Sequence, residues 1–361
     1  MQRIKSLDSY RGFIMLAMVW VHLCDWWLRE EDIWFSNATL PILKLIFGPG
    51  FLLLSGISIA LSYRKSLIKI TLIDDFKYSI VRKEYLFRAT FILIVALGYN
   101  SFVALQFFNP LDLWKWFMLL TMSISLFIAW PLLRAPKYIR LAVAIIIWVL
   151  NYFIFNYLLP YQNQTNANGV LYYFLYNSID VIPLPHYFSF LLIGTIIGEV
   201  IFDIYQLDHQ EERKVLLKKK ITFPSLMLGV PLIIISVFLD PQLSLERTSV
   251  IWIIFAIGIN LVLLSAFLGF EDFKSRINKR RLKFLFYYSY YSLTLYLAHN
   301  LLYFFFFNQI NLFLFWILVI LTCFFIGLFL GLIHNKYGSK FSIKAQVGRL
   351  SSALAKKLET I

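Results

Sequence analysis

The sequence is poor in charged residues and in cysteine. Only 15% of its 361 residues are Asp, Glu, Lys or Arg, while 60% are hydrophobic, against about 45–50% apolar residues in soluble domains. The two cysteines, Cys24 and Cys323, both fall inside apolar runs, so neither a disulfide framework nor a cysteine metal site is indicated. This composition excludes an ordinary soluble domain and predicts an integral membrane protein.

Motifs of soluble hydrolases and nucleotide-binding enzymes are also absent from the sequence. It contains no HExxH, CxxC, GxSxG or P-loop pattern, each of which places reactive groups at a fixed spacing. We therefore expect no metal. A short apolar segment followed by a small-residue cleavage site is missing as well, so we expect the first apolar segment to be a retained anchor.

Ten apolar segments are long enough to cross a bilayer, for which ~20 residues are needed. They are residues 10–28, 43–62, 86–107, 113–133, 139–159, 181–203, 222–239, 249–269, 284–307 and 311–334. We predict an all-α, polytopic membrane helix bundle over residues 1–335, with about ten transmembrane helices. Residues 336–361 are expected to form a cytoplasmic amphipathic tail, and residues 160–180 to include an interfacial helix.

The basic residues between these segments predict which way the chain is inserted. Thirty of the 34 Lys and Arg residues fall on one side of the predicted bundle, and Arg29, Lys44, Lys115 and Arg247 fall on the other. By the positive-inside rule, both termini are expected in the cytoplasm. Topology and attraction to anionic headgroups account for the net charge of +14, so no nucleic-acid partner is predicted.

A polar stripe runs along the first apolar segment. Asp8, Arg11, Met15, Met18, His22, Asp25 and Arg29 are spaced alternately three and four residues apart, which places them on one face of a helix. Charges at membrane depth are costly and usually face a bundle interior or a wet cavity. We expect this face to line a passage. An equally good alternative is that the charges form an ion pair at each end of the segment, Asp8 with Arg11 and Asp25 with Arg29.

Similar polar faces recur later in the chain. Ser289, Ser292, Tyr296, His299 and Tyr303 share one face of segment 284–307. In segment 43–62 a helix break is expected at GPGF (48–51), followed by Ser55, Ser58 and Ser62 on one side.

Three further features are interpreted structurally. Gly194 and Gly198 are predicted to serve helix packing, with the carboxylate of Glu199 beside them as a weaker site candidate. His186 is expected at the membrane interface beside aromatic residues, and His334 is expected to be solvated.

The start of the chain resembles the heparan-alpha-glucosaminide N-acetyltransferase family within the transmembrane acyltransferases. Members begin with a basic residue and S-L/V-D-x-x-R-G, followed by an apolar run with Met and a His or Asn. Here these places hold Arg3, Ser6-Leu7-Asp8, Arg11-Gly12, Met18 and His22. Residues 47–65, 87–100, 186–200 and 289–303 are similar to later family segments, so the resemblance covers about residues 1–335.

The resemblance implies transfer of an acetyl group from cytosolic acetyl-CoA to an amine or hydroxyl, such as that of a sugar or glycan, on the other side of the lipid bilayer. Arg11, Arg82, Lys83 and Arg88 would supply a basic mouth for the CoA phosphates, with Ser55 as a further donor-binding residue. Serine and tyrosine hydroxyls could donate to the oxyanion. The resemblance also allows a homodimer in a prokaryotic plasma membrane.

For the chemistry, the resemblance implies His22 as general base or as acyl carrier. Asp25 would orient it, and His299 would be a second polar partner. Family members that act on lysosomal heparan carry Asn in place of His22 and a histidine in the following loop, whereas here no histidine lies between His22 and His186. Two alternatives remain open: a carrier that uses the same polar face, although no internal repeat supports it, and an inactive scaffold.

Overall fold

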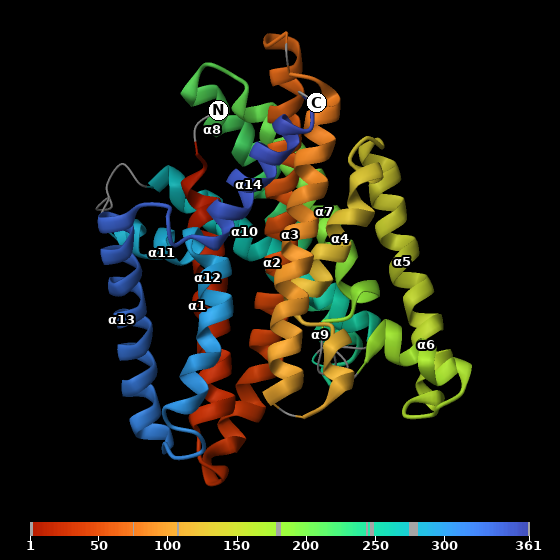
Figure 1. Cartoon of the computed structure of the whole chain (residues 1–361), viewed down its shortest axis with the longest axis vertical. Helices are drawn as coiled ribbons and strands as arrows, with labels where there is room; N and C mark the ends of the chain where they lie inside the picture. The colour runs from red at the N-terminus through yellow and green to blue at the C-terminus, as the bar shows by residue number, and fades with distance from the viewer. Residues whose placement is uncertain are drawn as a thin grey trace. The chain divides into compact units, whose positions relative to one another are not determined.

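The computed structural model of the chain describes residues 3–74, 76–106, 108–177, 182–242, 245, 249–273 and 281–359. Within these ranges the secondary structure is helical (Figure 1), apart from an isolated bridge between Leu28 and Ile310. Eight helices in the described ranges are long and apolar enough to cross a membrane. The predicted fold class, an all-α membrane protein, is therefore confirmed.

Most helices follow the predicted segments, whereas α2 extends ten residues beyond the predicted 43–62 at each end. The long ones are α1 (Lys5–Trp27), α2 (Ile33–Leu72), α3 (Tyr78–Gln106), α4 (Met118–Leu132), α5 (Lys137–Leu158), α7 (Leu184–Tyr205), α9 (Phe223–Leu239), α10 (Val250–Phe273) and α13 (Leu312–Tyr337). The shorter ones are α6 (Ala167–Tyr176), α8 (Gln210–Leu217), α11 (Arg281–Tyr290), α12 (Ser292–Ala298) and α14 (Ile343–Lys357). Four short 3-10 helices and a π-helix complete the described elements. The 3-10 helices are η1 (Glu30–Asp32), η2 (Pro110–Trp114), η3 (Leu159–Tyr161) and η5 (His299–Phe304), and the π-helix is η4 (Lys218–Thr222).

Two of the ten predicted segments are not among the eight apolar spans. One is α1, whose apolar character is reduced by its polar stripe. The other, residues 284–307, is divided into α11, α12 and η5 by interruptions at Tyr291 and His299. The number of ten spans, the cytoplasmic position of both termini and the division at residue 335 thus stay predictions.

The chain folds into two compact units, which we describe separately. Unit 1 contains residues Met1–Phe51, Lys214–Phe238 and Phe255–Gln346, and unit 2 contains Leu52–Arg213, Leu239–Ile254 and Val347–Ile361. The boundary divides α2, α8, α9, α10 and α14, so each of these helices contributes to both units.

In unit 1, α1 packs against α11, α12 and α13 (Figure 1). A Cβ on Gly12 would lie 2.0 Å from the carbonyl oxygen of Leu285 in α11, so the two backbones approach closely only because residue 12 is glycine. Met15 and Met18 are 1% and 6% exposed and lie in a hydrophobic core with Tyr288. The middle of the α1 stripe therefore packs in the core and does not line an open passage, because its two methionines fill irregular space between helices.

The predicted helix break at GPGF is wrong, since α2 is helical through Pro41 and Pro49. Pro49 has no N–H for the carbonyl of Leu45, four residues earlier. The side-chain amide of Asn260 in α10 donates to that carbonyl at 2.8 Å, and the hydroxyl of Tyr10 donates to the Asn260 Oδ1 at 2.7 Å. These side chains are buried, so the missing backbone bond is replaced from another helix.

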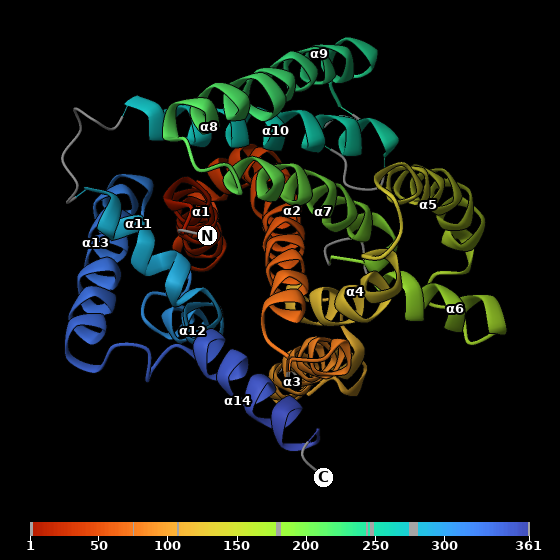
Figure 2. The same ribbon diagram turned by 90° about the horizontal axis from the view of Figure 1, so that it is seen from above.

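In unit 2, α2 packs against α7 through glycines, as predicted. Added Cβ atoms on Gly194 and Gly198 would lie 2.1 and 2.6 Å from the carbonyl oxygens of Leu53 and Ile57. Figure 2 shows α5 beside α7, and α3 beside α4. The glycine contacts hold the second half of α2 against α7, and this arrangement positions the basic side chains described below.

Both predicted short helices are present. The segment 160–180 contains α6, and the chain after Ser339 contains α14. Val347, Ser351 and Ala355, spaced four residues apart, are all buried. One face of the tail helix is therefore covered by protein, as the four-residue spacing of its small residues allows.

Candidate functional site

An aromatic cluster in unit 1 brings together two predicted site residues from distant parts of the sequence. The imidazole rings of His22 in α1 and His299 in η5 have centroids 4.7 Å apart. The Trp26 ring, one turn after His22, stacks on His22 at 4.9 Å and lies 5.7 Å from His299. Tyr296 and Tyr303 flank the cluster at 5.5 Å from His299 and 5.7 Å from Trp26. The shared polar faces predicted from the spacing do meet here.

The hydrogen bonds of His299 define which of its nitrogens carries a proton. Its Nδ1 lies 2.5 Å from the carbonyl oxygen of Tyr296. A carbonyl only accepts hydrogen bonds, so Nδ1 is the donor and, in the neutral ring, Nε2 carries the lone pair. The side chain is 2% exposed, and Nε2 has no hydrogen-bond partner among the described residues. A buried imidazole lone pair without a partner is a group able to accept a proton or bind an electrophile.

The other α1 candidates lie at the two ends of the helix. Asp25 is exposed and accepts a hydrogen bond from Ser36 at 2.9 Å. Asp8 accepts hydrogen bonds from Arg3 at 2.5 Å and from Ser289 at 3.2 Å. Arg11 is 9% exposed. The role of Asp25 in orienting His22 stays a prediction, and its hydrogen bond from Ser36 ties α1 to the start of α2.

The two remaining histidines with predicted surroundings are more enclosed than expected. His186, at the start of α7, is 2% exposed, and its Nε2 accepts a hydrogen bond from the Asn151 amide at 3.2 Å. The Tyr176 hydroxyl donates to the other end of that amide at 3.0 Å. His334 is half-buried among four aromatic rings, including Tyr291. The aromatic surroundings predicted for His186 are present, in Phe155 and Tyr176, and its interfacial position stays a prediction. The predicted solvated position of His334 is wrong, because packed aromatic rings cover its imidazole.

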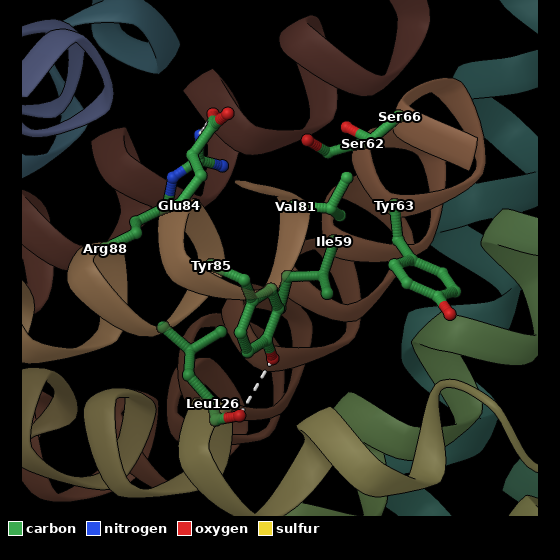
Figure 3. A pocket seen from close by; sticks show the side chains of 9 residues that line it. All are labelled: Ile59, Ser62, Tyr63, Ser66, Val81, Glu84, Tyr85, Arg88 and Leu126. Carbon is green, nitrogen blue, oxygen red and sulfur yellow. Dashed lines mark hydrogen bonds and ion pairs between the residues drawn. The ribbon is translucent and has the colours of Figure 1, made fainter. Parts of the chain in front are cut away.

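The predicted donor-binding residue Arg88 lines a small cavity in unit 2 (Figure 3). Figure 3 shows Ser62 and Ser66 of α2 facing the cavity together with Glu84 and Arg88 of α3. Arg88 Nη2 lies 3.2 Å from a Glu84 oxygen, and the Tyr85 hydroxyl donates to the Leu126 carbonyl at 2.8 Å. The cavity measures about 30 Å³, which is room for water and too little for a nucleotide.

The other predicted donor residues of unit 2 have different surroundings. Arg82 is exposed, and Ser55 is 5% exposed. Lys83 Nζ lies 2.6 Å from a carboxylate oxygen of Glu359 and donates to the Leu358 carbonyl at 3.0 Å. Lys83 is therefore occupied by the C-terminal tail, a contact that sequence spacing cannot predict because the partners are far apart in the chain.

A larger cavity with basic walls is also lined by Tyr63. It measures about 300 Å³ and is lined by Ala60, Tyr63, Arg64, Leu67, Leu133, Arg134, Ala135, Pro136, Arg140 and Glu199. The sequence indicates Glu199 as a weaker candidate. The three arginines of this cavity count in the sequence only as signals of membrane topology. The missed signal was that they flank helix ends on the same predicted side, where folding can bring them to one cavity.

Comparison with models of known protein families gives a match. The family model described as "Heparan-alpha-glucosaminide N-acetyltransferase, catalytic" matches residues 3–235, more than half of the chain. The matched range includes His22, Arg11, Arg82 and the arginines that line the two cavities, whereas the segment of His299 lies beyond it. No curated protein matches the chain.

Proposed function

Because the chain belongs to the heparan-alpha-glucosaminide N-acetyltransferase catalytic family of membrane acetyltransferases, we propose that it transfers an acetyl group from acetyl-CoA to an amine or hydroxyl. The donor is cytosolic, and the acceptor is a sugar or glycan on the extracytoplasmic side of the membrane. The observation that carries the proposal is that the His22 ring lies 4.7 Å from the ring of His299, whose buried Nε2 lone pair has no hydrogen-bond partner among the described residues.

In the proposed reaction, the lone pair of the acceptor nitrogen or oxygen forms a bond to the thioester carbonyl carbon. The carbon–sulfur bond then breaks, and CoA leaves as its thiol. The acceptor's proton passes through the histidine pair to the departing sulfur. His22 is half-buried and so open to a substrate, whereas His299 is enclosed, which fits His22 as general base or acyl carrier and His299 as its partner.

The enclosing aromatic rings have a part in this proposal. Trp26 stacks on both imidazoles, which limits their rotation and keeps bulk water away from the His299 lone pair. A neutral histidine is the form that can accept a proton near pH 7. Asp25 orients His22, and Arg11, Arg82, Arg88 and Ser55 are the proposed donor-binding residues.

Release of free thiol from acetyl-CoA by the purified full chain tests the proposal. Glucosamine and other amino or hydroxyl sugars serve as acceptors, and mass spectrometry identifies the acetylated product. We expect thiol release that depends on the acceptor and is lost in His22→Ala. Flux of a sugar through proteoliposomes without any thiol release would contradict the proposal and support a carrier.

A further inference from the structure

The geometry of the 300 Å³ cavity in unit 2 points to a site for a dianionic phosphate monoester, which we propose is the 3′-phosphate of the CoA donor. This inference rests on the proposed function for the identity of the donor. It assigns a subsite formed by Arg64, Arg134 and Arg140 and distinct from Arg82 and Arg88.

The charge of the cavity favours a doubly negative ligand. Its walls carry three guanidinium groups and the Glu199 carboxylate. Asp203 lies 3.5 Å from both Arg64 and Lys137. These four cations and two carboxylates leave an excess of two positive charges, which matches the charge of about −1.5 to −2 on a phosphate monoester at neutral pH.

The arginines are held in place before any ligand binds. Glu199 pairs with Arg140, and its other oxygen lies 2.8 Å from Arg64 Nη2. Arg140 is 3% exposed and also donates to the Thr195 hydroxyl at 3.1 Å. The Nε atoms of Arg64 and Arg140 are buried and have no hydrogen-bond partner among the described residues. Preorganised guanidinium groups lose little entropy when they bind phosphate oxygens.

Arg134 is the arginine best placed to bind an incoming anion. Its Nε donates to the Tyr78 hydroxyl at 2.6 Å, and its guanidinium lies 4.6 Å from the Tyr78 ring centroid. It is exposed, and it forms an ion pair with no carboxylate in the described part of the chain. Its charge is therefore not neutralised by the protein itself.

A helix terminus adds to the positive potential. Pro136 precedes the first residue of α5, a helix of 22 residues, and lines the cavity. The N-terminus of a long helix attracts anions through its unpaired N–H groups and its dipole. At about 300 Å³ the cavity also has room for a phosphate and part of an attached group, whereas the 30 Å³ cavity beside Arg88 has not.

The test compares binding of CoA and of 3′-dephospho-CoA to the full chain by titration calorimetry. We expect the wild type to bind CoA at least about tenfold more tightly, since one phosphate gains several charge-assisted hydrogen bonds. In Arg134→Gln this ratio should fall close to one. Lys65→Gln, which removes the same charge from the exposed neighbour of Arg64 on α2, should keep the ratio.

Nanodiscs containing phosphatidic acid, whose headgroup is also a phosphate monoester, distinguish the two sources of this chemistry. If CoA and 3′-dephospho-CoA bind equally but phosphatidic acid raises the melting temperature of the wild type and not of Arg134→Gln, the anion site stands and the CoA assignment is overturned. If Arg134→Gln changes neither the affinity ratio of CoA to 3′-dephospho-CoA nor the effect of phosphatidic acid on the melting temperature, the site itself is overturned. Acetyl transfer from saturating acetyl-3′-dephospho-CoA would then show that the proposed function survives without it.

Discussion

The side-chain amide of Asn260 donates a 2.8 Å hydrogen bond to the main-chain carbonyl of Leu45, the carbonyl that Pro49 leaves without its helical partner. Asn260 is 1% exposed. Inside a membrane-spanning bundle no water is available to replace such a bond. One asparagine thus allows a proline in the middle of a 40-residue helix.

This relationship makes a prediction for Asn260→Ala. The variant should lose about 1–3 kcal/mol of stability because the Leu45 carbonyl is left buried and unpaired. In the Pro49→Ala background the loss should be smaller, since the introduced alanine would supply the N–H that proline lacks. Thermal or denaturant unfolding in detergent measures both. Asn156→Ala, which removes an exposed asparagine, is the control; equal losses for Asn260→Ala in the two backgrounds would contradict the interpretation.

Gly12 in the Arg-Gly motif should tolerate no side chain. The added methyl of Gly12→Ala would meet the Leu285 carbonyl, so α1 and α11 must move apart at a cost of about 1–3 kcal/mol. Gly98→Ala is the matched control, because no atom of the described residues outside its own stretch of helix lies within 4 Å of the new Cβ and alanine favours helix by up to ~1 kcal/mol. Melting temperatures of the purified variants should fall for the first and stay or rise for the second. The reverse order would show that α1 and α11 are not packed this closely.

The histidine pair should control the rate of transfer more than the stability of the fold. His22→Ala is expected to lower kcat by ~10²–10⁴, the usual contribution of a general base, and His299→Ala by less. His209→Ala, which removes an exposed histidine, should leave kcat unchanged. Near-normal turnover in both His22→Ala and His299→Ala would place the base elsewhere.

The contact between the C-terminal tail and α3 should weaken in acid. The hydrogen bonds from Lys83 and Ser79 hold the pKa of the Glu359 carboxyl below its ordinary value. Because this pKa is lowered in the folded state, the contact stabilises the fold fully at pH values above the ordinary pKa of Glu, about 4.3. The stabilisation is lost as the pH falls through the lowered pKa of Glu359. Hydrogen exchange at the end of α14 should therefore rise in that acidic range. In Glu359→Gln it should be fast already at pH 7, whereas Glu212→Gln should match the wild type.

The sequence by itself was enough to determine the helices and the family. An apolar segment of ~20 residues crosses a bilayer as a helix, because a helix pairs every backbone N–H and C=O within the segment itself. The alternating spacing of three and four residues likewise places His22 on the polar face of α1, whereas His299 begins η5 after the end of α12. The Arg11-Gly12 motif at the start of the chain indicates the family that matches residues 3–235.

Only the tertiary structure decided what those residues touch. GPGF looked like a break because local rules do not include Asn260, which lies more than two hundred residues away from Pro49 in the chain. The tautomer of His299 follows from one backbone carbonyl, and the neutralisation of Lys83 follows from Glu359 at the far end of the chain. Arg64, Arg134 and Arg140 line one cavity because α2, α4, α5 and α7 pack together. Spacing along a helix determines which face a side chain shares, but its partners depend on which helices pack against that face.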